Sequence, residues 1–280
     1  MSLTASDEYC LNEVRRHDHD RYVTALFLPA DRRTATLALY AFNLEIARTR
    51  EIVSEPLLGQ IRLQWWRETI EGIYAGAPRE HPVVEALMSA IEMHGLSRTW
   101  FDGLIDAREA DLDDAPPYDL AALETYARET SGELSALAMF CIAGNSAPEL
   151  DAARRIGTAW ALVGLVRAVG FHAQTQRLYI PEDLLSEYEV ERRRLFDLKP
   201  APGLNRAIEV MVARAEGLLR EARDNAPEIG RPARCGLLLA RLADRQIAAI
   251  RGANCDPFAL PAARQAPILR LAIAAWRGRF

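Results

Sequence analysis

The sequence lacks both a long hydrophobic run and an excess of basic residues. No window holds about 18 consecutive apolar residues, which excludes a membrane-spanning helix. The formal net charge is −5 and the pI is about 5.7, so the composition does not indicate a nucleic-acid partner. The N-terminal segment contains acids in place of a basic stretch followed by an apolar one, so it does not resemble a signal peptide. We expect a cytoplasmic protein that is soluble, or at most peripheral at the inner membrane.

Paired cysteines and phosphate-binding motifs are also absent. Cys10, Cys141, Cys235 and Cys255 are far apart and form no C-x-x-C pair, which argues against zinc-ribbon and thioredoxin-like sites and favours a reducing compartment. There is no P-loop, no G-x-G-x-x-G motif and no Ser-His-Asp set, so kinase, Rossmann and hydrolase activities have no support. Lys199 is the only lysine among 34 basic residues, a bias that we attribute to a GC-rich genome.

Helical periodicity extends over the whole sequence. Good helix formers fill most windows and no segment alternates like a β-strand, so we predict an all-α fold. Connections are short and the composition does not shift, which indicates a single domain over residues 1–280. Trp65 and Trp66 diverge by about 100° on a helix, so at least one of them should lie in the core. The predicted helices cover residues 29–54, 58–74, 81–94, 97–113, 119–143, 148–173, 203–224, 231–251 and 262–278.

The last predicted helix is amphipathic. Leu269, Ile273 and Trp276 share one face, and Arg270 and Arg277 lie nearby. Such a pattern is typical of a helix on a membrane surface, and equally of a closing core helix with a solvated edge. We favour the core helix.

Two groups of acidic residues share a helix face by their spacing. Magnesium bridged to phosphates needs such carboxylates, usually one or two for each ion. Solvated acids and local ion pairs are commoner, so we favour a structural role for both groups. The His-Asp-His-Asp run at 17–20 is interpreted in the same way, because residues two apart point away from each other on a helix. The acids are Asp102, Asp106, Glu109 and Asp113 in one group, and Glu51 and Glu55 in the other.

A stripe of small residues marks the predicted helix 148–173. Gly157, Ala161, Gly164 and Ala168 follow i, i+4, i+7, i+11 spacing, and His172 continues the same face one turn later. Such a face lets another helix approach closely or lets a cavity run alongside. It offers no carboxylate, so it cannot hold a hard divalent cation.

Several segments, in their order and spacing, resemble the squalene/phytoene synthase family. They are ALYAFN at 38–43, HPVVEAL at 81–87, DAREADLDD at 106–114 and YARETSGEL at 126–134. A G-x-A…R…R-x-Y-x-P pattern follows, formed by Gly157, Ala159, Arg167, Arg177, Tyr179 and Pro181. The resemblance covers residues from about 9 to 250. It implies the all-α isoprenoid-synthase helical bundle, in which active members condense two prenyl diphosphates.

The resemblance also implies two aspartate-rich motifs that bind magnesium in active members, and this sequence departs from both. Depending on register, the first motif holds Ala47, Arg48 and Glu51, or Arg50, Glu51 and Ser54. The second motif holds Ala161, Gly164, Arg167, Ala168 and His172. Only the arginine of the second motif remains, at Arg167. In neither register does the first motif contain its aspartates.

Loss of these carboxylates removes the charge stabilisation that magnesium gives to a departing pyrophosphate. We therefore expect no catalytic residue, no metal and no cofactor. Arginines could still hold an anionic head group directly. The residues expected to line a vestigial ligand-binding pocket are Tyr40, Arg48, Glu51, Asp111, Gly164, Arg167, His172, Arg177 and Tyr179.

This pattern of loss resembles the branch of the family that contains a mitochondrial respiratory complex I assembly factor. The resemblance rests on residues 42–68 and 164–184. It implies a non-catalytic protein, a pseudoenzyme, whose partners are complex I subunits or assembly intermediates, or a scaffold that binds an isoprenoid lipid. The alternative is a divergent magnesium-dependent prenyltransferase that condenses two prenyl diphosphates at a site altered to use Glu51, Glu55 and Asp111.

Overall fold

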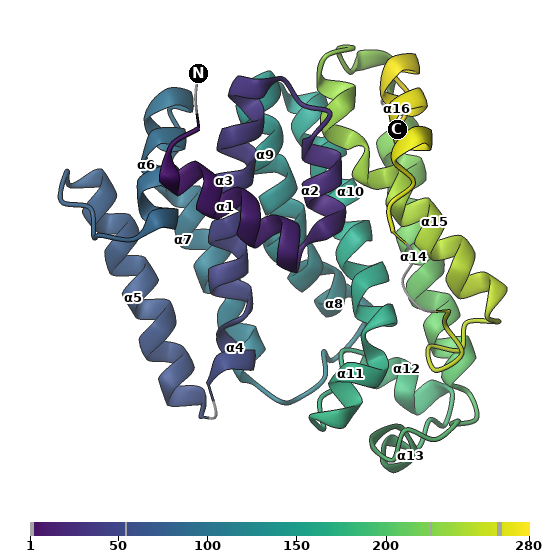
Figure 1. Cartoon of the computed structure of the whole chain (residues 1–280). Helices are drawn as coiled ribbons and strands as arrows, with labels where there is room; N and C mark the ends of the chain where they lie inside the picture. Colours follow the sequence, from purple (N-terminus) through teal and green to yellow (C-terminus); the bar gives the residue numbers. More distant parts are fainter. Residues whose placement is uncertain (1–2, 54, 225, 262–264) are drawn as a thin grey trace.

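Helices form every regular element in the residues that the computed structural model describes, which are 3–53, 55–224, 226–261 and 265–280. The all-α prediction is confirmed. The first half of the chain forms α1 (Ala5–His17), α2 (His19–Ala25), α3 (Ala30–Ala47), α4 (Thr49–Ile52), α5 (Pro56–Tyr74), α6 (Pro82–His94) and α7 (Arg98–Ala107). In Figure 1, α5, α6 and α7 lie on the left and α14, α15 and α16 on the right, while α1, α2, α3, α9 and α10 lie between them.

The rest of the chain begins with the 3₁₀ turn η1 (Arg108–Leu112) and a π-helical turn, η2 (Arg128–Gly132), between two α-helices. Further short elements join the long helices α10, α14 and α15. The α-helices are α8 (Leu120–Ala127), α9 (Glu133–Ala143), α10 (Ala147–Arg167), α11 (Val169–Gln174), α12 (Glu182–Glu187), α13 (Arg192–Phe196), α14 (Leu204–Asp224), α15 (Leu239–Gly252) and α16 (Ile268–Arg277). The remaining 3₁₀ turns are η3 (Ala226–Glu228) and η4 (Ala233–Leu237).

Two histidines lie at the ends of α6. The ring of His81 accepts a hydrogen bond from the Val83 N–H at 3.2 Å and so caps α6. That helix ends after His94 at Gly95, whose φ of 62° is a left-handed conformation that suits glycine. In the His-Asp-His-Asp run, Asp18 caps α2 through the Arg21 N–H. The run at 17–20 therefore contributes a helix cap, in agreement with its structural interpretation.

Five predicted helices are interrupted. The predicted helix 231–251 begins with the 3₁₀ turn η4 and becomes α-helical at Leu239. The predicted helix 97–113 ends at Ala107 and continues as η1, and the predicted helix 119–143 contains the π turn η2. The predicted helix 148–173 breaks at Ala168, whose ψ of 4° leaves the α region. The predicted helix 29–54 ends at Ala47, and its predicted end, Ser54, lies outside the described residues. The predicted start of the last helix, at 262–264, also lies outside them.

Two hydrophobic clusters form the core. The first fills the space between α1, α3, α5, α6 and α7, where Phe42 contacts Trp66 and Phe101 edge to face at centroid distances of 5.3 and 5.6 Å. The second is formed largely by α10, α14 and α15. Trp66 is 1% exposed and Trp65 is 36% exposed, which confirms that at least one of the two tryptophans is in the core.

Helix α10 crosses η2 and α9 at close range. A Cβ atom at Gly157 would lie 2.3 Å from the Ser131 carbonyl oxygen and 2.4 Å from the Ser135 hydroxyl. On the facing element, a Cβ at Gly132 would lie 2.7 Å from the Thr158 hydroxyl. One end of the small-residue stripe therefore serves helix packing, because only glycine lets the two backbones approach this closely.

The prediction that the C-terminal helix, α16, closes the core with Leu269, Ile273 and Trp276 is wrong. Leu269 is 81% exposed, Ile273 51% and Trp276 74%, so these three side chains do not close the core. The helix instead buries Leu271, at 1% exposure, from another face. Within the described residues, no helix is both long enough and apolar enough to span a membrane.

Candidate functional site

A buried carboxylate, Asp111, lies at the centre of a polar cluster. The 3₁₀ turn η1 directs its side chain inward, where it is 7% exposed. The hydroxyls of Tyr126 and Tyr179 donate to Asp111 Oδ1 at 2.6 and 2.9 Å. Arg108 Nη1 donates to Asp111 Oδ2 at 3.2 Å. Both carboxylate oxygens are therefore engaged by the protein's own donors.

Arg108 joins this cluster to α3. Its Nη2 donates to the Asn43 side-chain oxygen at 3.1 Å, and its Nη1 lies within 3.3 Å of the Tyr126 hydroxyl. The Arg108 side chain is 12% exposed, and Asn43 is 6% exposed. A buried guanidinium next to a buried carboxylate is stable only while each satisfies the other, so these groups hold α3, η1 and α8 together.

The chain that follows α11 completes the cluster. Gln176 has a left-handed φ of 56°, and the turn there brings Arg177 and Tyr179 back toward η1. Arg177 Nη2 donates to the Asp111 carbonyl at 2.7 Å and to the Asp113 carbonyl at 3.1 Å. His172 packs on the Tyr179 ring at a centroid distance of 4.8 Å. Four predicted pocket residues, Asp111, His172, Arg177 and Tyr179, are thus brought together.

Burial changes the titration of this cluster. It lowers the pKa of His172 to about 4, with the positive charge of Arg177 acting in the same direction. Burial, and then the negative charge of Asp111, raises the pKa of Tyr179 to about 12. Tyr126 has a raised pKa for the same two reasons. At neutral pH the two tyrosines are therefore hydrogen-bond donors and His172 is uncharged.

The other predicted pocket residues lie apart from this cluster. The Tyr40 ring is buried on α3 and stacks with the Arg21 guanidinium at 5.6 Å. Arg48 lies between α3 and α4 and Glu51 lies within α4; their charged atoms are 4.0 Å apart and both side chains are partly exposed. Glu51 does not contribute to a cluster of acids.

Gly164 and Arg167 mark the unpacked end of α10. A Cβ atom at Gly164 would meet no other atom within 4 Å, in contrast to the tight contact at Gly157. Arg167 forms no hydrogen bond or ion pair with any described residue. Burial and then the charge of Asp18 raise the pKa of Asp20, and the charge of Arg167 partly opposes this rise.

The surface acids of the block 102–114 are engaged in ion pairs. Arg67 Nη2 lies 2.7 Å from both Asp106 and Glu109, and Arg98 Nε lies 3.1 Å from Asp102. Asp113 falls outside the helix and accepts from the Ala115 N–H at 3.0 Å. The predicted structural role of this group is confirmed, although the four acids do not share one helix face.

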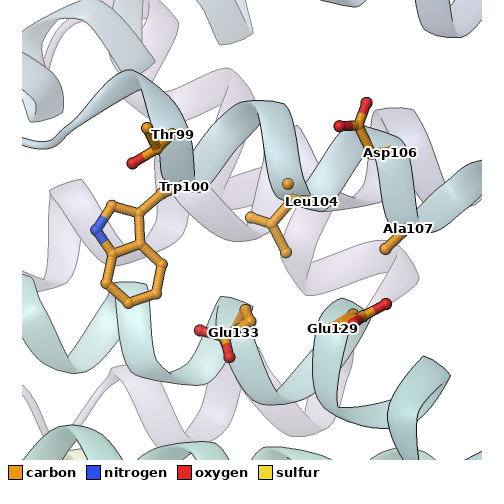
Figure 2. A pocket seen from close by; sticks show the side chains of 8 residues that line it. Thr99, Trp100, Leu104, Asp106, Ala107, Glu129 and Glu133 are labelled. Atoms are coloured by element: carbon orange, nitrogen blue, oxygen red, sulfur yellow. The ribbon is translucent and has the colours of Figure 1, made fainter.

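A groove of about 520 Å³ runs between α7 and the η2–α9 segment (Figure 2). Trp100 and Leu104 line it from α7, and Glu129 and Glu133 face them from the opposite element. Glu133 pairs with Arg154 at 2.7 Å, and Glu129 pairs with Arg128 at 3.2 Å. None of the nine predicted pocket residues lines this groove, so it lies outside the predicted site.

Comparisons with known proteins identify the family of this chain. The squalene/phytoene synthase family model matches residues 14–274. The chain belongs to the squalene/phytoene synthase family. A dehydrosqualene synthase crystal structure superimposes with a TM-score of 0.85 at 19% identity, covering 97% of this chain and 95% of that chain, which supports the fold.

Relatives within the family carry a different name. The Bos taurus protein "NADH dehydrogenase (ubiquinone) complex I, assembly factor 6" is 34% identical over 184 residues, which is 66% of this chain and 55% of that protein. Its Dictyostelium discoideum homolog is 26% identical over 274 residues, covering 96% of this chain and 76% of that protein. The chain thus matches little more than half the length of its mammalian relative.

The magnesium ions implied by the squalene/phytoene synthase family do not fit the residues present. The motif positions hold Arg48 and Glu51 at the α3–α4 turn, and Ala168 and His172 at the α10–α11 junction. Both carboxylate oxygens of Asp111 accept hydrogen bonds from the protein, and its charge is paired with Arg108 at 3.2 Å. Among the described residues, no three His, Cys, Asp or Glu side chains gather in a way that could hold a metal ion.

Three cluster residues were not singled out from the sequence. Arg108, Tyr126 and Asn43 all bind within the Asp111 cluster. Each lies in a segment that carries the family resemblance: DAREADLDD, YARETSGEL and ALYAFN. The family resemblance could have drawn attention to these three residues, but the sequence does not show that their side chains contact one another.

Proposed function

We propose that this protein is a non-catalytic member of the squalene/phytoene synthase family that takes part in the assembly of respiratory complex I. The proposal rests on one observation: the buried carboxylate Asp111 is bound on both oxygens by Tyr126, Tyr179 and Arg108. A group held in this way stabilises the fold, and a cation would have to compete with Arg108 and two tyrosine hydroxyls for this buried carboxylate.

The condensation of prenyl diphosphates depends on carboxylates that can hold dications. Ionisation of a prenyl diphosphate separates an allylic cation from pyrophosphate, and bridging dications stabilise the departing charge by several kcal/mol. Those dications need clustered, unpaired carboxylates. In this chain the candidate acids are paired with arginine or isolated, so the condensation lacks its main source of transition-state stabilisation.

The relatives supply the direction of the proposal. Proteins named complex I assembly factor 6 are up to 35% identical to this chain. We extend that role to this protein, with complex I subunits or assembly intermediates as its partners at the cytoplasmic face of the membrane.

Deletion of the gene in its native host tests this role. NADH:ubiquinone oxidoreductase activity of isolated membranes should fall, and the plasmid-borne wild-type gene should restore it. Succinate-driven respiration of the same membranes is the matched control and should not change. Unchanged amount and activity of complex I in the deletion strain would contradict the proposal.

Incubation of the pure protein with farnesyl or geranylgeranyl diphosphate and magnesium tests the alternative activity. We expect no condensation product. A product whose formation stops when EDTA is added would replace the non-catalytic proposal with a divergent prenyltransferase.

A scaffold that binds an isoprenoid lipid is a second candidate, favoured by the open end of α10. Free space beside Gly164 could accept an apolar chain, and Arg167, without a hydrogen bond or ion pair among the described residues, could bind an anionic head group. Native mass spectrometry should detect a co-purified lipid in the wild type. Gly164→Leu should lose it, whereas Gly252→Leu, at another open position, should retain it. A wild-type protein that neither carries lipid nor takes up added prenyl lipid would exclude this candidate.

A further inference from the structure

Helix α16 displays apolar side chains to solvent while it is firmly attached to the bundle. Ile268 and Ile273 are more than half exposed, and Leu269 and Trp276 are more exposed still, at 81% and 74%. On the opposite side of the helix, Leu271 is buried at 1% exposure. The exposed face is therefore a feature of the folded chain.

Arginines of the bundle hold the end of α16 in this orientation. Arg231 Nη2 donates to the Trp276 carbonyl at 3.1 Å, and Arg234 Nη1 donates to the Gly278 carbonyl at 3.2 Å. Beyond the helix, Arg223 Nε donates to the Phe280 carbonyl at 3.0 Å, and the Phe280 side chain is buried. Rotation that would bury Trp276 would break these contacts.

The charge around α16 is positive, in contrast to the acidic chain as a whole. No Asp or Glu occurs after Asp256, whereas the formal net charge of the complete chain is −5. Arg270 and Arg277 are exposed and seven residues apart, so they lie along the same side of the helix, beside Ile273. Neither side chain forms an ion pair with any described residue.

A second exposed apolar face, on α5, shows why charge matters for the choice of occupant. Leu57 and Ile61 are 63% and 58% exposed there, but Glu51 and Glu55 lie beside them in sequence and are exposed. Arg62, the nearby base, is paired with Glu45 at 2.6 Å. Only α16 combines an apolar face, an interfacial tryptophan and unpaired cations among these two faces.

We propose that α16 docks on the surface of a membrane that contains anionic phospholipids. The apolar face, Ile268, Leu269, Ile273 and Trp276, enters the headgroup boundary, and Arg270 and Arg277 contact lipid phosphates. Because α16 lies at the opposite end of the molecule from α4 and α11 (Figure 1), the Asp111 region stays away from the bilayer. The proposal does not depend on a role in complex I assembly.

Flotation of the full-length protein with lipid vesicles tests this docking. Vesicles of phosphatidylcholine with phosphatidylglycerol should bind the protein, and vesicles of phosphatidylcholine alone should bind it weakly. The double variant Leu269→Ser, Trp276→Ser should lower the partition coefficient about tenfold or more. Both residues are exposed, so the variant should keep the wild-type thermal stability.

Matched variants test whether vesicle binding depends on the α16 face or arises from any exposed apolar surface of the protein. Leu57→Ser, Ile61→Ser removes two apolar side chains of α5 that are 63% and 58% exposed, and should leave vesicle binding unchanged. Arg270→Gln, Arg277→Gln should weaken binding by about fivefold for each charge removed. Arg193→Gln, Arg206→Gln removes the same charge from exposed positions of α13 and α14 and should have a smaller effect.

Three outcomes would overturn the proposal. One is the absence of binding to anionic vesicles. Another is binding that the α16 apolar variant and the α5 variant reduce equally. The third is self-association of the wild type, abolished by Leu269→Ser, Trp276→Ser without vesicle binding, which would assign the face to a second copy of the chain.

Discussion

Two parts of one acidic segment behave in opposite ways. Asp106 and Glu109 have side chains that are 63% and 58% exposed, and they share Arg67 on the surface. Asp111, two residues further on, is 7% exposed and receives hydrogen bonds from three side chains. The difference arises because α7 ends at Ala107 and the 3₁₀ turn η1 directs Asp111 into the protein.

This contrast shows that burial, not the number of carboxylates, decides what an acidic residue does here. Exposed pairs are screened by water and salt, so each contributes little. A buried carboxylate has lost its hydration and depends on its protein donors, so removing either side of the interaction is costly. Asp111 should therefore dominate the stability of this region, and the surface acids should matter little.

The largest effect is expected from Asp111→Ala, which leaves the Arg108 guanidinium and two tyrosine hydroxyls without their acceptor. The free energy of unfolding should fall by about 3–5 kcal/mol. Urea denaturation followed by circular dichroism measures it, with Asp106→Ala as the control that should cost less than about 1 kcal/mol. If Asp111→Ala fails to fold, Asp111→Asn, which keeps an acceptor, should fold with a smaller loss. Equal losses of unfolding free energy for Asp111→Ala and Asp106→Ala would contradict the expected difference between buried and exposed acids.

The next effect concerns pH. His172 has a pKa of about 4 in the folded protein, lowered mainly by burial, against about 6.5 when unfolded. Between these values the unfolded chain binds a proton that the folded chain does not, so stability falls as pH decreases through this window. The His172→Gln variant should lose up to about 3 kcal/mol less than the wild type between neutral pH and pH 4. Parallel stability profiles for the two proteins would contradict this expectation.

A smaller effect is expected for the tyrosine donors. Tyr126→Phe and Tyr179→Phe each remove one hydrogen bond to a buried carboxylate, and each should cost about 1.5–3 kcal/mol. Because both hydroxyls donate to Asp111 Oδ1, the double variant should deviate from the sum of the single variants. Tyr118→Phe is the control, since Tyr118 is 79% exposed and should change stability by less than about 0.5 kcal/mol. Strict additivity would show that the two donors act independently.

The smallest effect belongs to the surface. Arg67→Gln removes both ion pairs, to Asp106 and to Glu109, and should lower stability by less than about 1 kcal/mol. The loss should shrink further in concentrated salt, whereas the loss from Asp111→Ala should persist. Thermal denaturation at two salt concentrations makes the comparison. A large, salt-independent loss for Arg67→Gln would place the surface acids on a par with Asp111.

Helical periodicity predicted most of the long helices, although not α1, and it did not predict their interruptions. The π turn at 128–132, RETSG, contains the weak helix formers Thr130, Ser131 and Gly132, but helix continues on both sides of it, so its sequence does not distinguish a π turn from an α-helix. Its place is set by close packing between Gly132 and Thr158 and between Gly157 and Ser131, residues distant in sequence. Ala168 is likewise a strong helix former at a break. Tertiary packing overrides local preference at both positions.

The candidate site was predictable in part. The family resemblance pointed to Asp111, Arg177 and Tyr179, which the structure brings together, but not to the pairing of Arg108 with Asn43, 65 residues apart. Periodicity also misassigned α16, because an apolar face has the same pattern whether it meets a core or solvent. The pattern identified the face but not its surroundings.

The π turn η2 also limits the deletions that this fold tolerates. A π turn takes up one residue more than α geometry does, so α9 runs out of phase with α8 by one position, roughly 100°. Deletion of a single residue within 128–132 would remove that offset and turn Leu134 and Leu137 away from the core that they fill. A substitution at an exposed position of the turn, such as Glu129, changes one side chain, but a one-residue deletion here would shift the phase of the whole helix that follows.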